Sequence, residues 1–271
     1  SLPAGVLDTL TATFGMLVAV RVYAMGDMAK ASFLAATSGG MVTSLFVVPL
    51  LLRAKSTIAR TAAKVQMLGG ASMAVSATFP DSPSLYLLGL GLGIFCFSMQ
   101  IPLMTQIYRM NYPEAARGKL YAIAGATRAG AAVAFGFGAG WLLDLDLQHY
   151  TWLLWAYALG GIVSGLWTYG LPATPWQPDE NAQSSLWSAW RWVRADRDFR
   201  TLLISWMMMG VGNLAAACLF VEYLANPAHG INLPEKQVAF ITCVVPVLAR
   251  LLFSYPRGTL YDSLHTLGAR T

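Results

Sequence analysis

The stretch SLYLLGLGLGIFCFSMQIPLMTQIY, residues 84–108, contains no charged residue and is followed at once by the basic segment RMNYPEAARGK, residues 109–119. A helix needs about 20 apolar residues to cross the roughly 30 Å hydrocarbon core of a bilayer, so this stretch is long enough to span one. Barrel strands alternate in polarity over about 10 residues. The continuous apolar character therefore predicts a membrane-spanning helix.

Seven further runs of the same kind occur, and basic residues accumulate in every second gap. The eight runs lie near 4–26, 31–52, 63–80, 84–108, 118–143, 151–171, 200–224 and 237–255. Fourteen of the 18 Lys and Arg residues lie in the even-numbered gaps or around the end of run eight: Arg53, Lys55, Arg60, Lys64, Arg109, Arg117, Lys119, Arg191, Arg194, Arg197, Arg200, Arg250, Arg257 and Arg270. The positive-inside rule places such gaps in the cytoplasm. We therefore predict an all-α, polytopic transmembrane helical bundle with about eight spans.

The composition excludes several classes of protein. Apolar residues make up 56% of the chain and charged residues only 11%, whereas soluble domains carry about 25% charged residues. Anionic inner-leaflet lipid accounts for the net charge of +5, so we predict lipid and no nucleic acid as a partner. Cys96, Cys218 and Cys243 lie scattered within apolar runs, which predicts neither a disulfide framework nor a zinc site.

No enzyme signature is present. His149, His229 and His265 lie in separate loops, on both sides of the membrane in this topology, so they predict no shared catalytic or metal site. The phosphate-binding string Gly-x-x-x-x-Gly-Lys-Ser/Thr does not occur, so ATP-driven transport has no support. We expect no enzyme, no cofactor and no metal.

The connection at residues 172–199 divides the chain. Its first part is a Pro-broken linker, and its second part places Leu186, Trp187, Trp190 and Val193 on one helical face. This pattern predicts a helix in the cytoplasmic interface, with a solvated linker helix as the alternative. Residues 1–171 then form a six-helix half, and residues 200–271 begin a second half.

Small residues follow run five closely, at Gly125, Gly130, Gly136, Gly138 and Gly140. Small side chains let helix backbones approach each other in lipid. The simpler interpretation is plain helix packing. The alternative is a close-packed surface that slides during a conformational cycle.

Six helices, a long cytoplasmic linker and further helices together resemble the major facilitator superfamily of secondary transporters. Residues 258–270, GTLYDSLHTLGAR, resemble the family's loop signature Gly-x-Leu-x-Asp-Arg-x-Gly-Arg, with Gly258, Leu260 and Asp262 in place and Ser263 where the first Arg stands. The strings at 112–119, 136–144 and 194–200 are similar to the family's loop between helices four and five, the end of helix five and the entry to helix seven. The loop at 52–60 departs from the family, since it lacks the signature Gly and Asp.

The resemblance implies a protein of twelve helices in two halves, in the bacterial inner (plasma) membrane, that moves a small solute by alternating access. Because the chain begins at Ser1 without Met and stops near the threshold of helix nine, we expect it to be a fragment cut at both ends. Gly258, Asp262 and Arg270 would form its conformational-gating loop. The alternative function is a non-transporting membrane scaffold or solute sensor with the same fold.

Polar groups inside the apolar runs are the candidate substrate contacts. Arg128 lies deep in run five, where an uncompensated charge costs at least about 2.5 kcal/mol, so we predict an anion-binding or counter-ion group; a structural pair with a carboxylate or carbonyl groups is the alternative. Gln100 in run four and Asn213 in run seven lie on helices that the resemblance places around a central cavity. The alternative for both is an interhelical hydrogen bond.

Two carboxylates are candidates for proton coupling. Asp8 lies in run one and Glu222 near the outer end of run seven. Burial would favour a protonated carboxyl group at either position, whereas an interfacial position would leave both merely solvated. Protons and a small-molecule solute are therefore the predicted transported partners.

Overall fold

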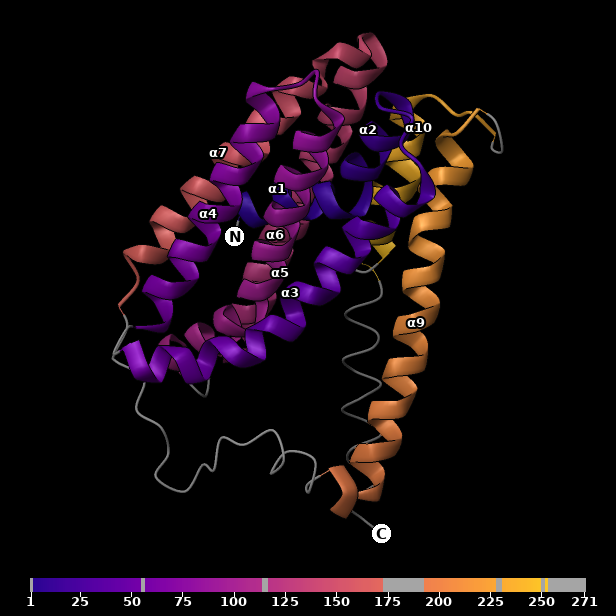
Figure 1. Cartoon of the computed structure of the whole chain (residues 1–271). Coiled ribbons are helices and arrows are strands. Elements are labelled where there is room, and N and C mark those ends of the chain that lie inside the picture. Colours follow the sequence, from indigo (N-terminus) through magenta and orange to yellow (C-terminus); the bar gives the residue numbers. More distant parts are fainter. Residues whose placement is uncertain are drawn as a thin grey trace.

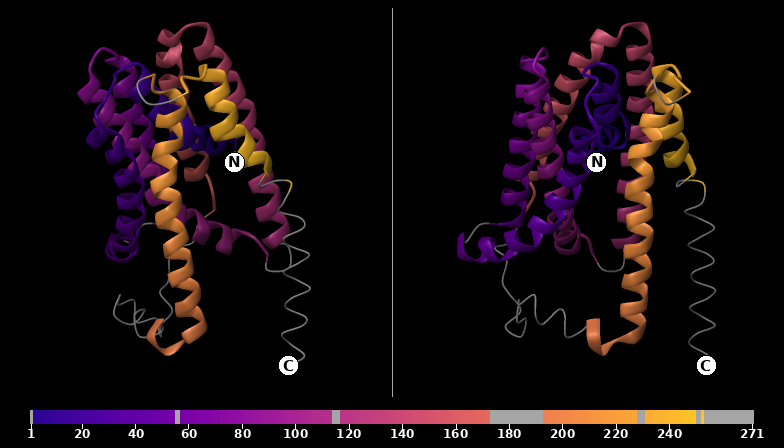
Figure 2. Two further views of the ribbon diagram at one scale, coloured as in Figure 1. Left: turned by 90° about the vertical axis from the view of Figure 1, so that its right-hand side faces the viewer. Right: turned by 45° about the vertical axis from the view of Figure 1, so that its right-hand side comes forward.

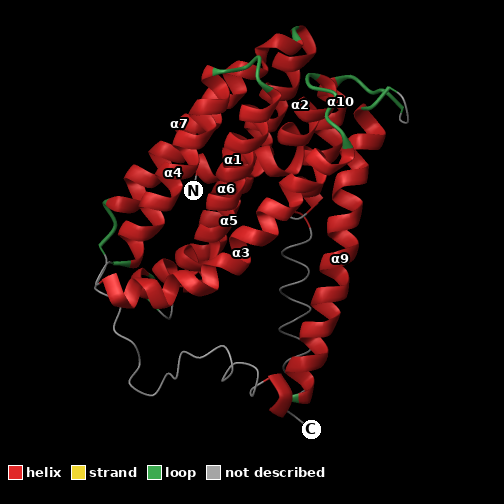
Figure 3. Ribbon diagram, viewed as in Figure 1, coloured by secondary structure: helices red, strands yellow, loops and turns green. Residues whose placement is uncertain are grey.

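The computed structural model describes residues 2–54, 57–113, 117–172, 193–227, 231–249 and 252. Within these residues every regular element is a helix and no β-strand occurs (Figure 3). The predicted all-α class is confirmed. The interfacial helix expected before residue 193 and the gating residues Gly258, Asp262 and Arg270 lie outside the described residues.

A described helix overlaps each of the eight apolar runs, with ends that differ by up to five residues where both are described (Figure 1). These helices are α1 Leu2–Thr9, the π-helical η1 Leu10–Phe14, α2 Gly15–Arg21, α3 Asp27–Ala54, α4 Ile58–Thr78, α5 Pro83–Asn111, α6 Arg117–Leu145, the 3₁₀ turn η3 Leu147–His149, α7 Tyr150–Tyr169, α9 Arg197–Ala225, α10 Glu235–Ala239 and the π-helical η4 Phe240–Val244. The segments α1, η1 and α2 form one continuous helix, which we call helix 1.

Local capping sets several helix starts. The Thr57 hydroxyl accepts a hydrogen bond from the backbone N–H of Arg60, so α4 begins five residues before its apolar run. Ser82 and Asp196 cap α5 and α9 in the same way. α3 begins at Asp27, four residues before its apolar run, and the turn that precedes it lies at residues 22–26, where Ala24 adopts a left-handed φ of 44°.

Two of the described helices are long and apolar enough to cross a membrane, Pro83–Asn111 and Leu120–Leu145. Eight spans are therefore not shown. Core helices of soluble proteins can pass the same test, but the apolar stretch of the second helix is only 11% buried. Burial in a protein core does not account for that helix.

The outward faces of other helices are also apolar. On α7 the exposed side chains Trp152, Trp155, Leu159 and Leu166 follow helical spacing along one face. On α9 Trp206, Met207, Met208 and Met209 are exposed. Soluble monomers rarely expose apolar patches larger than a few hundred Å², so these faces require lipid or other protein segments against them.

Glycines allow α4 to lie tightly between α5 and α7. A Cβ on Gly70 would stand 2.8 Å from the Ala158 carbonyl oxygen and 2.8 Å from the Ile162 nitrogen, both backbone atoms of α7. On the opposite side a Cβ on Gly69 would stand 3.0 Å from the Cβ of Cys96 on α5. The two neighbouring glycines thus serve two different helix crossings.

The later helices pack on the first six through a similar contact. A Cβ on Gly136 of α6 would stand 2.8 Å from the Cys243 Sγ atom, and a Cβ on Gly140 would stand 2.8 Å from the Ala239 Cβ atom. Figure 2 shows α10 alongside α6. Gly125, Gly130 and Gly138 have no such neighbour within 4 Å, so only part of the expected small-residue surface is packed.

We expect Gly70→Ala to lower the free energy of unfolding by about 1–3 kcal/mol, because its Cβ meets backbone atoms that cannot move independently. Thermal unfolding of the detergent-solubilised protein measures this change. Gly125→Ala is the matched control, since nothing lies within 4 Å of that position and alanine favours helix. Equal effects of the two substitutions would refute the tight crossing.

Candidate functional site

The crossing of helix 1 and α6 brings two predicted site residues together. Gly5 lies against the backbone of Arg128 and Ala132, so helix 1 and α6 approach closely there. Asp8 lies one turn further along helix 1 and reaches the Arg128 side chain. The sequence left Arg128 open as an anion-binding group, a counter-ion or a structural partner of a carboxylate, and made Asp8 a candidate for proton coupling. The structure pairs the two with each other.

The pair is bidentate and open to its surroundings. Arg128 Nε donates to Asp8 Oδ2 at 2.6 Å and Arg128 Nη2 donates to Asp8 Oδ1 at 2.5 Å. The side chains are nevertheless 46% and 43% exposed, respectively. Such a fork-to-fork contact is the geometry by which guanidinium groups recognise carboxylates and phosphates in general. A small anion that enters from the exposed side would therefore compete with Asp8 for Arg128.

Two tyrosines lie beside the Asp8–Arg128 pair. Tyr108 on α5 and Tyr121 on α6 lie near Arg128, and their ring centroids are 5.9 Å apart in an edge-to-face arrangement. Thr11 is exposed on helix 1, and its hydroxyl donates to the Asp8 carbonyl oxygen at 3.1 Å. We call Asp8, Arg128, Tyr108 and Tyr121 the Asp8–Arg128 site.

The two amide side chains predicted to contact the substrate, Gln100 and Asn213, lie away from the Asp8–Arg128 pair. Gln100 accepts a hydrogen bond from the buried Gln66, and the Gln66 side-chain oxygen accepts one from the Thr168 hydroxyl at 3.1 Å. Gln100 thus joins an interhelical network of α4, α5 and α7. Asn213 lies exposed on α9. The structure brings neither amide to the Asp8–Arg128 site.

Glu222 has a charged partner that the sequence did not predict. Lys30 Nζ donates to Glu222 Oε2 at 2.7 Å, from the first turn of α3 to the last turns of α9. Burial by itself lowers the pKa of Lys30, but hydrogen bonds and charges of Glu222 and Asp27 outweigh it, so the net pKa is raised. The ammonium group therefore stays charged.

A second unpredicted contact joins the two π-helical segments. The hydroxyls of Thr13 in η1 and Thr242 in η4 hydrogen-bond at 2.6 Å. Single-turn π segments often occur at functional sites. The two π turns have no recognisable signal in the sequence. Their contact has none either, because Thr13 and Thr242 are more than two hundred residues apart.

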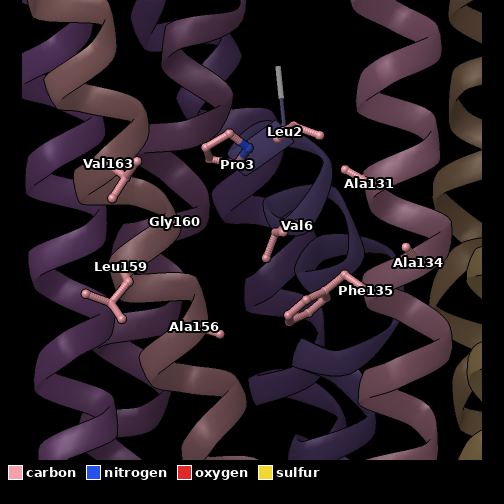
Figure 4. A pocket seen from close by; sticks show the side chains of 10 residues that line it. All are labelled: Leu2, Pro3, Val6, Ala131, Ala134, Phe135, Ala156, Leu159, Gly160 and Val163. Atoms are coloured by element: carbon pink, nitrogen blue, oxygen red, sulfur yellow. The ribbon is translucent and has the colours of Figure 1, made fainter.

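An open groove of about 530 Å³ lies between α1, α6 and α7, lined by Leu2, Pro3, Val6, Ala131, Ala134, Phe135, Ala156, Leu159, Gly160 and Val163 (Figure 4). Ligand sites combine apolar walls with a few polar groups that orient the ligand. The lining of this groove is wholly apolar. It suits an acyl chain or a side chain better than a polar solute.

Metal-ligating side chains do not cluster in the part of the chain that the structure describes. Cys96 and Cys243 are buried free thiols. The described residues therefore offer no ready set of metal ligands.

No protein family, curated protein or solved structure compared with this chain matches it. Function is therefore argued from the site itself.

A double-mutant cycle with Asp8→Asn and Arg128→Gln should give a coupling free energy of about 1 kcal/mol or less, because the pair is nearly half exposed. We expect the coupling to fall in about 1 M salt, where the Debye length is roughly 3 Å. Unfolding in detergent at low and high salt measures it. The more buried Lys30–Glu222 pair is the control, with a smaller salt dependence. A salt-insensitive Asp8–Arg128 coupling would show that water does not reach the pair.

Proposed function

We propose that the protein is a secondary active transmembrane transporter of the major facilitator type, which moves a small solute by alternating access. The observation that carries this proposal is the Asp8–Arg128 ion pair, held half open between helix 1 and α6, whose apolar stretch is only 11% buried. Ionisable residues within membrane spans are rare and generally mark solute, ion or proton pathways.

Membrane insertion rests on three observations together. The basic residues gather in alternate gaps, two helices pass the length and composition test, and large apolar side chains point outward on α7 and α9. In this proposal all eight helical segments cross the bilayer, with the even-numbered loops in the cytoplasm of a bacterial cell. The smaller apolar character of some segments follows from the small residues that they need for packing.

The chemistry of the Asp8–Arg128 site favours proton-coupled movement of a small anion or zwitterion. An anion that binds Arg128 would displace Asp8 and leave its carboxylate without a counter-ion. In an occluded site of low dielectric a carboxylate in that position takes up a proton. Solute and proton would then move together, since each stabilises the binding of the other.

A membrane scaffold or solute sensor is the second candidate. The loop at 52–60 lacks the family's signature residues, and Asp8 and Arg128 satisfy each other without any ligand. A sensor would bind a solute at the site and never carry it across. Binding without flux therefore separates the two candidates.

We expect saturable, pH-dependent flux when the protein is reconstituted into liposomes and offered a panel of small organic anions and amino acids. Arg128→Gln should lower kcat/KM at least about tenfold, equivalent to about 1.4 kcal/mol, because the recognising guanidinium is lost. Asp8→Asn should retain solute binding but lose the pH dependence of flux.

Thr127→Val is the matched control, since Thr127 lies beside Arg128 on α6 and its hydroxyl bonds only to the Ile123 carbonyl among the described residues. It should leave kcat/KM within about twofold of the original value. Solute binding without flux for the whole panel would favour the sensor. Unchanged flux in Arg128→Gln would exclude the Asp8–Arg128 site.

A further inference from the structure

Two ion pairs join the first helices to the later ones at the same end of the molecule. Arg21, the last residue of α2, lies 3.5 Å from Glu235, the first residue of α10. Its Nη2 atom also donates to the Leu233 carbonyl oxygen at 2.7 Å. The Arg21 Nε–H group is buried and has no hydrogen-bond partner among the described residues, which leaves this contact incompletely satisfied.

The second pair lies beside the first. Lys30 of α3 binds Glu222 of α9, and the two side chains are only 11% and 19% exposed. Asn226 also donates to Glu222 from the next turn of α9. Asp27 contacts Lys30 at 3.3 Å as well, but its side chain is fully exposed.

Charge is complementary across this contact. Both cations come from the first two helices, and both carboxylates come from α9 and α10. In Figure 1 the ends of α2, α9 and α10 meet at the top of the molecule. Nearby, the Tyr23 and Tyr150 hydroxyls both donate to the Pro80 carbonyl oxygen, which ties the loops of the first six helices at that same end.

The opposite end of α9 has no comparable contact within the described residues. Every residue from Arg197 to Met209 is exposed, whereas Val221 and Ala225 are buried. Most of the first half of α6, from Tyr121 to Arg128, is exposed as well. Among the described residues, α9 is therefore held to the first helices at its Glu222 end and makes no such contact at its Arg197 end.

We propose that the Arg21–Glu235 and Lys30–Glu222 pairs form a latch that holds the Arg21 end shut, and that breaking it lets α9 and α10 part from α2 and α3 there. The latch rests on the proposed function for its purpose, because a transporter must open this end once in each cycle. Partly buried pairs suit a latch: removal of one partner leaves a poorly solvated charge, so the closed state loses population.

Cysteine reactivity tests the latch without any solute. Val221 is buried one residue before Glu222, so Val221→Cys in a background lacking Cys96, Cys218 and Cys243 places a thiol behind the latch. The probe is a charged, water-soluble methanethiosulfonate applied to the purified protein. We expect Lys30→Ala and Arg21→Ala each to increase the labelling rate about tenfold, because the open state gains population.

Two further variants exclude simple misfolding. Asp27→Asn removes only the fully exposed neighbour of Lys30 and should leave labelling unchanged. The charge swap Lys30→Glu with Glu222→Lys should restore slow labelling that Lys30→Glu alone has lost. Rescue by the swap supports the latch, since a misfolded protein would not recover.

The latch and the proposed function fail in different ways. Labelling that stays slow in both single variants, or a swap that does not rescue, would overturn the latch even if flux is observed. Fast labelling with rescue would support the latch even if no solute is carried.

Discussion

Contact between helix backbones at glycine is the constraint on which the rest of this structure depends. In the lipid environment that we propose for this protein, no hydrophobic force would drive one apolar helix against another, so association would rely on close packing and hydrogen bonds. Gly70 meets the backbone of α7, and Gly5 meets the backbone of α6. The position of Asp8 opposite Arg128 follows from the second crossing, because a bulkier residue at Gly5 would move helix 1 away from α6.

These helix crossings also bring oppositely charged side chains together. Asp8 and Arg128 are 120 residues apart, and Lys30 and Glu222 are 192 residues apart. In each pair a cation on one helix neutralises a carboxylate on another, which lowers the cost of placing charge near an apolar environment. The difference between the pairs is exposure: the Asp8–Arg128 site stands nearly half open, whereas the latch pairs are largely enclosed. An open pair suits exchange with a ligand, and enclosed pairs suit the closure of an interface.

The two π-helical segments add a third link between the early and late helices. Thr13 and Thr242 meet where η1 and η4 face each other, close to the packed glycines Gly136 and Gly140 of α6. A π turn shifts the helical register, so its carbonyl groups lose their usual α-helical partners. Helix 1 and the α10–η4 helix thus both widen into a π turn at the level where they touch.

The helical class and the approximate positions of the described helices follow from the sequence alone, and the caps at Thr57, Ser82 and Asp196 are local contacts that the sequence analysis did not identify. Apolar run length and capping are local properties, so neighbouring residues determine them. α4 is not among the two helices that are long and apolar enough to cross a membrane, because the Gly, Ala, Ser and Thr residues that pack it also dilute its apolar character. The sequence could identify Asp8, Arg128 and Glu222 as charges in unusual places. Only the tertiary structure decided their partners, since those depend on which helix faces which and at what depth they cross, and no local pattern encodes a contact between residues more than a hundred positions apart.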